Sequence, residues 1–391
     1  MSLYIYVFLA VTMSATIALI KPKWDKFLYY VSWLVLTLFL CLRFGQGTDY
    51  PTYMCIYNYA KTALEPSLGF VYYLNNIHSE IGWKILMVIF QFFNIKFWVV
   101  TSLLGFITML YSHLFIKKFC VSYKTLSLVL IYPTIYLTYY FSGIRQGLIM
   151  AIFYGVLLDK VFQRKYVQYV LGVLLLGTFH KVGLLLLFVP VILKMKKKHF
   201  EIGFVFSLVI AMAMTLRPMQ NLIKSTAAVL GIWVEYFAQI EISWFSLAER
   251  ILGLTIILVM WHMNNNEIKQ KVAPFMKLYL ASFLIYLCLC WNPFIASRIA
   301  ILFKMVEIVL FPTLLVGQKN HIKKIVFVSC LTVSALMMYK NLNFYSEIYY
   351  EQISGYNLPY VSILNKYEIL EYREEFINEA YDFRESEYLR N

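Results

Sequence analysis

The sequence predicts an all-α, polytopic integral membrane protein, and three observations support this. Hydrophobic residues make up 61% of the 391 residues, against roughly 45–50% in soluble domains, and only 14% of the chain is charged. Apolar runs close to the roughly 20 residues that a spanning helix needs recur along the whole chain. Between them lie short lysine-rich loops, which are typical of the cytoplasmic side of a membrane protein.

The apolar runs set the expected topology. They lie at 3–20, 27–42, 97–116, 125–141, 144–162, 201–216, 251–263, 275–291, 299–316 and 325–340. Segment 166–193 is too long for one span and has lysines on both sides, so we interpret it as two short helices that meet near His180. The run 81–93 is short, and a full crossing there would place the lysines of 117–124 outside. We therefore expect about 12 transmembrane helices plus one partial, re-entrant helix, with the N-terminus outside.

These features define the expected domain organisation. Residues 1–340 form one transmembrane domain, with an outer loop at 43–80 and an outer amphipathic segment at 217–248. Residues 341–391 form a tail with ten acidic and four basic residues. The first run lacks the basic start and the small-residue cleavage site of a signal peptide, so we expect an ordinary first span. The six cysteines include no C-x-x-C pair, which indicates structural thiols and no zinc site.

Charge indicates which partners to expect. The net charge of +14 comes from lysines in loops expected to contact anionic lipid heads at the cytoplasmic face. There is no arginine-rich stripe with interleaved aromatic residues, so we expect membrane lipids as partners and no nucleic acid.

The arginines are distributed differently from the lysines. Of nine arginines, five lie at the mouths of long apolar runs: Arg43, Arg145, Arg217, Arg250 and Arg298. If the lysine loops face inward, all five come to the outer face. Arginine at a membrane edge is costly unless it binds something, and its planar fork suits phosphate. The sequence therefore predicts an outward-facing site for an anionic, membrane-bound ligand.

The loop after the second apolar run is the first candidate part of this site. It reads Arg43-Phe44-Gly45-Gln46-Gly47-Thr48-Asp49-Tyr50-Pro51-Thr52-Tyr53. Its two glycines let the backbone turn tightly and approach a ligand. Arg43 and Asp49 could hold a pyrophosphate and a sugar hydroxyl. An ordinary Gly-Asp turn with a snorkelling arginine would explain the same residues.

Three further motifs place polar residues at helix ends. Glu80 and Lys84 are four residues apart at a helix start, where a helix cap and an ion pair would explain both. Ser142-Gly143-Ile144-Arg145-Gln146-Gly147 begins a span. Its glycines permit close helix packing, whereas Arg145 and Gln146 lie at the positive end of the helix dipole, which favours an anion. His180 is either an acid–base group or a histidine hydrogen-bonded to the backbone at the bend.

Two more groups lie in the C-terminal half. Asn292-Pro293-Phe294, followed by Ser297-Arg298, opens another span at the same expected face. Lys304 and Glu307 are three residues apart within the hydrocarbon, where we expect them to neutralise each other. Arg217 and Arg250 bracket the amphipathic segment and are interpreted as its anchors.

Several signatures of other enzyme classes do not occur. The chain has no Walker-type phosphate loop, no G-x-S-x-G, no H-E-x-x-H and no D-x-D motif for a metal-bound nucleotide sugar. A donor that carries its own prenyl-pyrophosphate leaving group would need none of these, so we expect no metal and no cofactor.

Four of these motifs occur together and in the same order in one protein family. They are Arg43-Phe44-Gly45-x-Gly47-Thr48-Asp49-Tyr50-x-x-Tyr53, Glu80-x-Gly82-Trp83-x-x-Leu86, Ser142-x-x-Arg145-Gln146 and Phe179-His180. With Arg298 and the ending Asn357-Leu358-Pro359-Tyr360, the chain resembles over nearly its whole length the EpsG family of Wzy-type bacterial polysaccharide polymerases. Trp83 and Lys181 depart from the family pattern, and Lys181 leaves the role of His180 open.

The resemblance implies a GT-C-like glycosyltransferase of the bacterial cytoplasmic (inner) membrane, with its active site facing the periplasm or exterior. It would transfer a growing glycan from undecaprenyl pyrophosphate onto a new lipid-linked repeat unit of an O-antigen, capsule or exopolysaccharide. A flippase and a chain-length regulator would be its pathway partners. Arg43, Arg145 and Arg298, with Gln146 and Tyr53, would bind the donor and stabilise the departing pyrophosphate. Asp49, Glu80 or His180 would deprotonate the acceptor hydroxyl, and Asp49 is the first choice because its glycine neighbours admit a sugar.

Other functions predict different patterns. A lipid-linked oligosaccharide flippase would carry Arg and Lys deep within its spans. An envelope O-acyltransferase takes its acyl donor from the cytoplasm and would carry Arg and His on that side. A structural scaffold has no need for outer-face arginines at four helix ends. An O-antigen ligase uses the same donor chemistry, and only the motif resemblance separates it from a polymerase.

Overall fold

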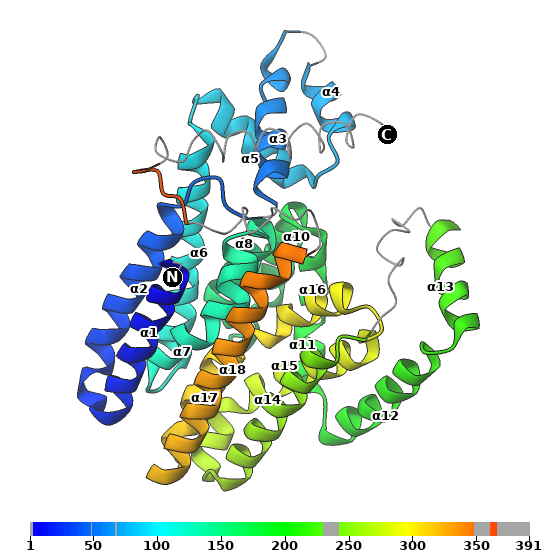
Figure 1. Cartoon of the computed structure of the whole chain (residues 1–391). Coiled ribbons are helices and arrows are strands. Elements are labelled where there is room, and N and C mark those ends of the chain that lie inside the picture. Colours follow the sequence, from blue (N-terminus) through cyan, green and yellow to red (C-terminus); the bar gives the residue numbers. More distant parts are fainter. Residues whose placement is uncertain (1–2, 48, 67–68, 230–241, 348–359, 366–391) are drawn as a thin grey trace. The chain divides into compact units, whose positions relative to one another are not determined.

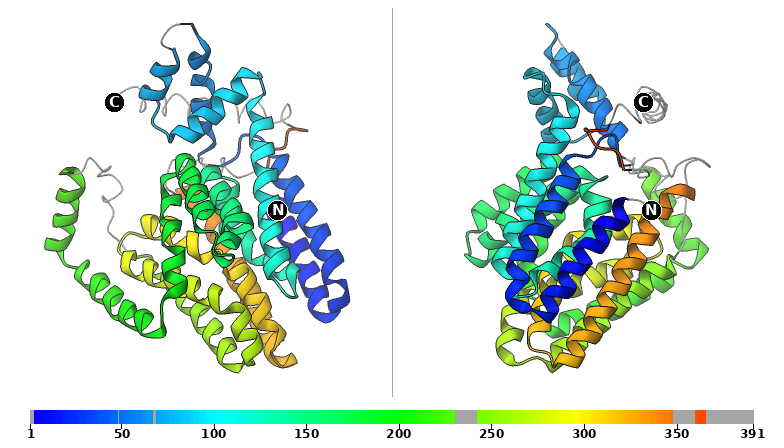
Figure 2. Two further views of the ribbon diagram at one scale, coloured as in Figure 1. Left: turned by 180° about the vertical axis from the view of Figure 1, so that it is seen from behind. Right: turned by 60° about the vertical axis from the view of Figure 1, so that its left-hand side comes forward.

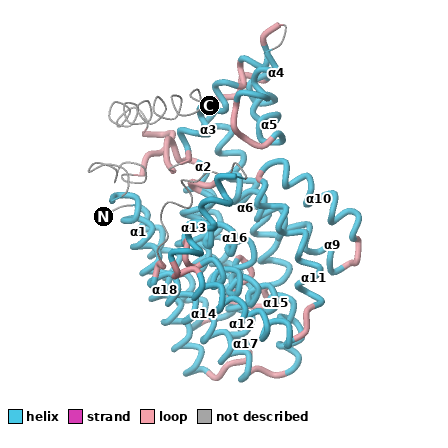
Figure 3. Tube along the Cα trace, turned by 90° about the vertical axis from the view of Figure 1, so that its right-hand side faces the viewer, coloured by secondary structure: helices cyan, strands magenta, loops and turns pink. Residues whose placement is uncertain are grey.

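The computed structural model describes residues 3–47, 49–66, 69–229, 242–347 and 360–365, and the regular structure of these ranges is helical apart from one isolated bridge (Figures 1 and 3). The predicted all-α class is confirmed. The chain divides into two compact units. Unit 1 comprises Met1–Leu184 and Cys330–Asn391, and unit 2 comprises Leu185–Ser329.

The number of candidate spans is lower than predicted. By length and hydropathy, six helices can cross a membrane: α1 (Leu3–Ile20), α2 (Asp25–Cys41, with the 3₁₀ turn Pro22–Trp24 before it), α6 (Phe97–Phe119), α14 (Trp244–Met263), α15 (Asn266–Leu289) and α18 (Asn320–Glu347). Two bent pairs raise the number to eight: α12 (Lys197–Ala213) with α13 (Arg217–Val229), bent by 95°, and α16 (Pro293–Lys304) with α17 (Glu307–Val316), bent by 49°. The protein is therefore a multi-pass membrane protein, but the predicted count of about 12 spans was wrong.

Three apolar stretches are interrupted helices: 125–141 and 144–162, which the sequence predicts as single spans, and 166–193, for which it predicts two short helices. Run 125–141 forms α7 (Lys124–Ile131) and a π-helical segment, Tyr132–Tyr140. Run 144–162 forms α8 (Ile144–Ile152), the π-helical turn Phe153–Leu157 and α9 (Leu158–Phe162), and segment 166–193 forms α10 (Tyr166–Phe179), the 3₁₀ helix Lys181–Phe188 and α11 (Val189–Lys194). The predicted break near His180 is confirmed, because α10 ends at Phe179. Hydropathy counts apolar residues and does not detect the π-helical changes of hydrogen-bond pattern, the first of which has Pro133 in its first turn.

In unit 1, α1 and α2 lie side by side, as both views of Figure 2 show, and both pack on α7. α6 packs against α2 and α8. Asp25 caps α7 by accepting the backbone N–H groups of Lys124 (2.9 Å) and Thr125 (3.1 Å), which have no partner within their own helix. The hydroxyl of Tyr136 donates to the carbonyl oxygen of Leu36 at 2.6 Å. The π-helical segment is thereby fastened to α2.

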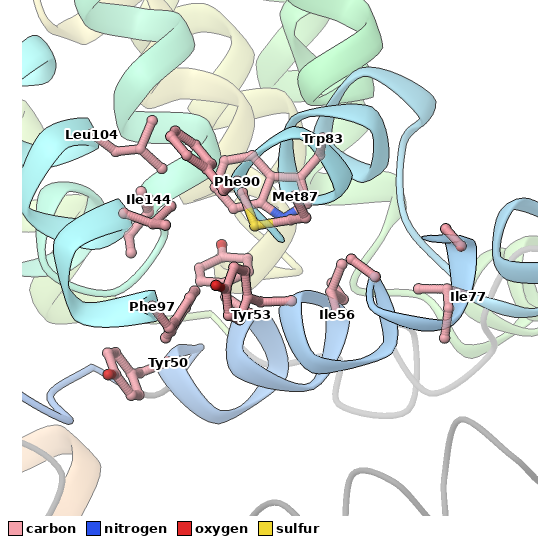
Figure 4. Packing of buried hydrophobic residues seen from close by; sticks show 14 of the residues in the cluster. Tyr50, Tyr53, Ile56, Ile77, Trp83, Met87, Phe90, Phe97, Leu104 and Ile144 are labelled. Atoms are coloured by element: carbon pink, nitrogen blue, oxygen red, sulfur yellow. The ribbon is translucent and has the colours of Figure 1, made fainter. Parts of the chain in front are cut away.

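The predicted outer loop 43–80 contains helices of its own. They are α3 (Tyr50–Tyr59), the 3₁₀ turn Thr62–Leu64 and α4 (Gly69–Asn76), and α5 (Ile81–Phe92) follows. Tyr50, Tyr53, Trp83, Met87 and Phe97 form part of one buried cluster that joins α3, α5 and the start of α6 (Figure 4). With 12 residues, α5 is too short to cross a bilayer, and its re-entrant course stays a prediction.

Unit 2 is built around α15, which packs against α11, α12, α14, α16 and α17. The hydroxyl of Ser282 on α15 donates to the carbonyl oxygen of Ala300 on α16 at 2.8 Å. Of the predicted amphipathic segment 217–248, α13 and the start of α14 are described, and residues 230–241 lie outside the described residues. The predicted tail boundary at residue 341 falls inside α18, and only 341–347 and 360–365 of the tail are described.

Candidate active site

The chain leaves α2 through a tight loop. Gly45 and Gly47 have φ angles of 63° and 105°, which glycine adopts without strain. A Cβ atom on Gly47 would lie 2.6 Å from the carbonyl oxygen of Phe141, so the approach of this loop requires glycine. The backbone N–H of Asp49 then donates to the hydroxyl of Ser142 at 3.3 Å. The loop that carries Asp49 therefore lies against the residues that precede Arg145.

Arg43 is enclosed at the start of this loop. Its side chain is 1% exposed, and its Nη1 donates to the carbonyl oxygen of Tyr140 at 2.6 Å. Its guanidinium carbon lies 5.0 Å from the centre of the Phe141 ring. Nε and Nη2 have no hydrogen-bond partner among the described residues. Burial lowers the pKa of Arg43, although a guanidinium stays charged at neutral pH.

Glu80 is the centre of a polar cluster. Its Oε2 pairs with Nη1 of Arg145, which also donates to the hydroxyl of Ser79 at 3.0 Å. Its Oε1 lies 3.0 Å from Nδ1 of His180 and accepts the backbone N–H of Lys181 at 3.1 Å. Residues at the starts of α5 and α8 and at the end of α10 thus meet at one carboxylate.

The contact with Glu80 determines which nitrogen of His180 is free to accept a proton. A carboxylate can only accept hydrogen bonds, so a neutral His180 carries its proton on Nδ1 and leaves Nε2 as the acceptor. A histidine held in this way by a carboxylate is oriented for general-base chemistry.

The carboxyl group of Glu80 is held in its ionised form. Burial acts to raise its pKa, but the hydrogen bond with His180 and the charges of Arg145 and His180 outweigh burial and lower the pKa to about 2. A carboxylate with so low a pKa is a poor proton acceptor near neutral pH. Glu80 is therefore suited to orient His180 rather than to take the proton itself.

The same pKa gives an expected pH dependence. Because the folded-state pKa of Glu80 lies below the ordinary value of 4.5, its ionisation stabilises the folded chain fully above pH 4.5 and loses this effect as the pH falls through about 2. We expect the thermal unfolding midpoint of the purified protein to fall more between pH 4.5 and 2.5 than that of a Glu80→Gln variant. Parallel curves for the two proteins would contradict the ionised assignment.

A glycine contact sets the spacing between Glu80 and His180. A Cβ atom on Gly82 would lie 2.3 Å from Oγ1 and 2.9 Å from the carbonyl oxygen of Thr178, so α5 and α10 touch here. Glu80 precedes Gly82 by two residues, and His180 follows Thr178 by two. The close approach of the two helices thereby brings the carboxylate to the imidazole.

We expect Gly82→Ala to destabilise the protein by about 1–3 kcal/mol, as overpacking typically does, and to weaken the Glu80–His180 contact. Gly143→Ala is the matched control, because a Cβ there would have its nearest neighbour at 3.4 Å, an ordinary contact, and the φ of Gly143 is −75°. The thermal unfolding midpoint in detergent measures the stability of both variants. Equal midpoints for the two variants would contradict the proposed role of the contact.

Lys84 does not pair with Glu80, so the predicted ion pair was wrong. Its Nζ donates to the carbonyl oxygens of Leu74 and, at 3.0 Å, Ile77, at the end of α4. The last carbonyls of a helix lack partners and carry partial negative charge, so a buried lysine caps them well. Glu80 makes no cap bond to its own helix either. Its carboxylate is thus directed to Arg145 and His180.

Asp49 and Tyr53 are linked to this cluster through Arg145. The hydroxyl of Tyr53 donates to Oδ2 of Asp49 at 3.3 Å, and the guanidinium carbon of Arg145 lies 5.4 Å from the centre of the Tyr53 ring. Gln146 is buried on α8, next to Arg145 in the chain. The structure thus links five predicted site residues in one chain of contacts: Asp49, Tyr53, Glu80, Arg145 and His180.

The predicted residues of the C-terminal half belong to unit 2. Arg298 lies on α16, with its guanidinium carbon 4.0 Å from the centre of the Phe294 ring. Asn292 caps the same helix by accepting the backbone N–H of Ile295 at 3.1 Å. For Arg298, a role in binding the substrate together with the unit 1 residues stays a prediction.

Unit 2 also contains a buried charged cluster. The predicted contact of Lys304 with Glu307 is confirmed at 3.5 Å, and a shorter one, of 2.7 Å, joins Lys304 to Glu249 on α14. Arg250 lies 3.4 Å from Glu249, and its guanidinium carbon is 3.8 Å from the centre of the Tyr286 ring. The sequence interprets Arg250 only as an anchor of the amphipathic segment, whereas the structure buries its side chain in this cluster.

Ser79 and Thr178 were not singled out by the sequence. Ser79 shares Nη1 of Arg145 with Glu80, and Thr178 is the neighbour of Gly82. The signal available for Ser79 is its position directly before Glu80. For Thr178 it is the position two residues before His180. Neither is distinctive, since serine and threonine occur at many helix ends.

Comparison with known proteins identifies the family. The comparisons with curated proteins and with solved structures find no match. A family model described as the EpsG family, which is linked to polysaccharide biosynthesis, matches residues 26–362. This range includes the loop that carries Arg43 and Asp49, the polar cluster around Glu80, and Arg298. The chain therefore belongs to the EpsG family.

Proposed function

We propose that the protein is a membrane glycosyltransferase that polymerises undecaprenyl-pyrophosphate-linked repeat units into an O-antigen, capsular polysaccharide or exopolysaccharide at the outer face of the cytoplasmic membrane. The observation that carries this proposal is the carboxylate of Glu80 held between Arg145 and His180. It combines a phosphate-binding cation with an oriented base, the two groups that such a transfer requires. Membership of the EpsG family supports the polysaccharide substrate.

His180 is our choice for the base. Its Nδ1 is occupied by an ionised Glu80, which leaves Nε2 as the acceptor. Asp49, the first choice from sequence, accepts a hydrogen bond from Tyr53, and we assign it to positioning the acceptor sugar. In the reaction, the acceptor hydroxyl loses its proton to Nε2 of His180 while its oxygen forms a bond to the anomeric carbon of the donor. The bond from that carbon to the pyrophosphate oxygen breaks, and undecaprenyl pyrophosphate leaves with the electron pair.

Arg145 and Arg43 would bind the pyrophosphate. Arg145 lies in the first turn of α8, where the helix dipole also favours an anion. Arg43 has two nitrogens without a partner among the described residues, and the two oxygens of a phosphate would satisfy them. Because Arg43 is enclosed, a phosphate would reach it only when neighbouring residues move, and Gly45 and Gly47 give the adjoining backbone conformational freedom.

The faces of α5 and α10 suit a lipid-linked substrate. Ile85 and Ile89 on α5 are exposed, as are Leu171 and Leu175 on α10. Both helices adjoin the Glu80 cluster, α5 at its start and α10 at its end. A prenyl chain attached to a pyrophosphate at Arg145 would lie against this apolar surface and the surrounding lipid.

The glycan ladder of a deletion strain tests the function. We expect loss of the gene to leave a single repeat unit on the acceptor, and the intact gene to restore the full ladder. Loss of a flippase or of a ligase would leave no repeat unit at all on the acceptor, and this result would exclude the polymerase. An O-acyltransferase would leave the ladder intact and change only its acylation.

Replacing arginine by lysine tests the phosphate site. Arg43→Lys and Arg145→Lys keep the positive charge but lose the planar fork, so we expect each to reduce polymer by about tenfold or more at normal protein levels. Arg217→Lys is the matched control, because Arg217 is exposed at the start of α13. Full ladders from both site variants would mean that Arg43 and Arg145 have a structural role and do not bind the phosphate through their planar forks.

A further inference from the structure

A short C-terminal segment pairs with the residues around Arg43. Tyr360–Ile363, which we name the C-terminal strap, lies antiparallel to Leu42–Phe44, with Ser362 opposite Arg43 (Figure 1). The backbone N–H of Phe44 donates to the carbonyl oxygen of Val361 at 2.9 Å, and the backbone N–H of Ile363 donates to the carbonyl oxygen of Leu42 at 2.8 Å. The pairing joins residues more than 300 positions apart, so its loop-closure entropy must be offset by specific contacts.

Tyr360 supplies the main side-chain contact of the strap. Its ring stacks on Phe39 with centroids 4.3 Å apart and planes inclined by 17°, and its hydroxyl donates to the carbonyl oxygen of Phe39 at 2.7 Å. Its ring also meets Tyr4 edge-on at 5.9 Å. Phe39 lies in the last turn of α2, four residues before Arg43. The strap is therefore fastened to the helix end from which Arg43 emerges.

The environment of Arg43 gives this contact a functional meaning. Its guanidinium is buried with only Nη1 bonded and with Nε and Nη2 unpaired among the described residues. A buried guanidinium with two unsatisfied nitrogens is costly, so we expect its position to depend on how firmly the adjoining backbone is held. Leu42 and Phe44, the residues on either side of Arg43, are the two that bond to the strap.

We propose that Tyr360 is a positioning residue for the pyrophosphate site: through the strap it fixes the backbone of Leu42–Phe44 and so directs the Arg43 guanidinium toward the phosphate. This inference rests on the proposed function. When Gly45–Gly47 move to admit the phosphate, the strap keeps Arg43 itself in place. The strap would then be a part of the substrate site contributed by the far end of the chain.

Binding of undecaprenyl pyrophosphate to the purified full-length protein in detergent tests the inference. We expect Tyr360→Ala to weaken binding by about tenfold, the effect of losing one good contact to a phosphate. Tyr360→Phe keeps the ring stack and should stay within about threefold of the wild type. The control is Leu364→Ala, whose side chain is 78% exposed directly after the strap and which should bind as the wild type does. Thermal unfolding confirms that each variant is folded.

A double-mutant cycle separates positioning from general stabilisation. If Tyr360 acts through Arg43, then Arg43→Lys combined with Tyr360→Ala should bind within about twofold of the weaker single variant. Additive losses in the double variant would overturn the inference. Should Tyr360→Ala not fold, Asn365→Ala takes its place in the cycle, because Asn365 accepts the N–H and hydroxyl of Ser362 at 2.8 Å each.

The two proposals fail in different ways. A wild-type protein that binds undecaprenyl pyrophosphate no more tightly than protein-free detergent micelles do would overturn the proposed function and this inference with it. Tight binding by the wild type, together with unchanged binding by Tyr360→Ala, would overturn the inference alone.

Discussion

Replacing His180 by alanine is expected to reduce polymer formation about 10²–10⁴-fold, the usual contribution of a positioned general base, while the binding of undecaprenyl pyrophosphate survives. The imidazole lies 3.0 Å from the ionised carboxylate of Glu80, which leaves Nε2 to take the proton of the acceptor hydroxyl. The glycan ladder of a complemented deletion strain measures polymer, and immunoblotting measures the level of the protein.

Two companion variants distinguish the base from its supports. Glu80→Gln removes the charge that orients His180 but keeps the shape of the side chain, so we expect a loss no larger than in His180→Ala. Asp49→Asn keeps the hydrogen bond from Tyr53 and should lose less again. A larger loss in Asp49→Asn than in His180→Ala would transfer the role of base to Asp49.

Local spacing and chain topology account for what the sequence could predict. The cluster of Asp49, Glu80, Arg145 and His180 was predictable as a set because each residue lies at a helix end, and successive helices return the chain to the same region. The contact of Lys304 with Glu307 was predictable because residues three apart on a helix face each other.

What the sequence missed depends on packing between helices. The span count failed because π-helical and 3₁₀ segments divide apolar runs without changing their hydropathy. The Glu80–Lys84 pair failed because the carbonyls of α4, which come near only after folding, compete for the ammonium. The partnership of Lys304 with Glu249 joins α16 to α14, and no spacing in the sequence indicates it. The strap was missed for the same reason.

Replacing Lys304 by methionine is expected to destabilise the protein by about 3–5 kcal/mol, as breaking a buried ion pair does. The ammonium lies 2.7 Å from Glu249 and 3.5 Å from Glu307, and the side chain of Lys304 is 5% exposed. Without it, Glu249 keeps Arg250 at 3.4 Å, whereas Glu307 loses the ion-pair partner that the described residues provide. The loss is measured as the decrease in thermal unfolding midpoint of the purified protein.

Two further variants show that the unpaired charge causes the loss. In Lys304→Met combined with Glu307→Gln, one charge of each sign is removed and the pair of Glu249 with Arg250 remains, so we expect most of the lost stability to return. Lys271→Met is the matched control, because Lys271 lies at the same 2.7 Å from Glu267 but the two side chains are 54% and 73% exposed. Exposed pairs contribute about 0–1 kcal/mol, so this variant should unfold nearly as the wild type does. Equal losses in Lys304→Met and Lys271→Met would mean that burial does not govern the strength of these pairs, and the argument for the unit 2 cluster would fail.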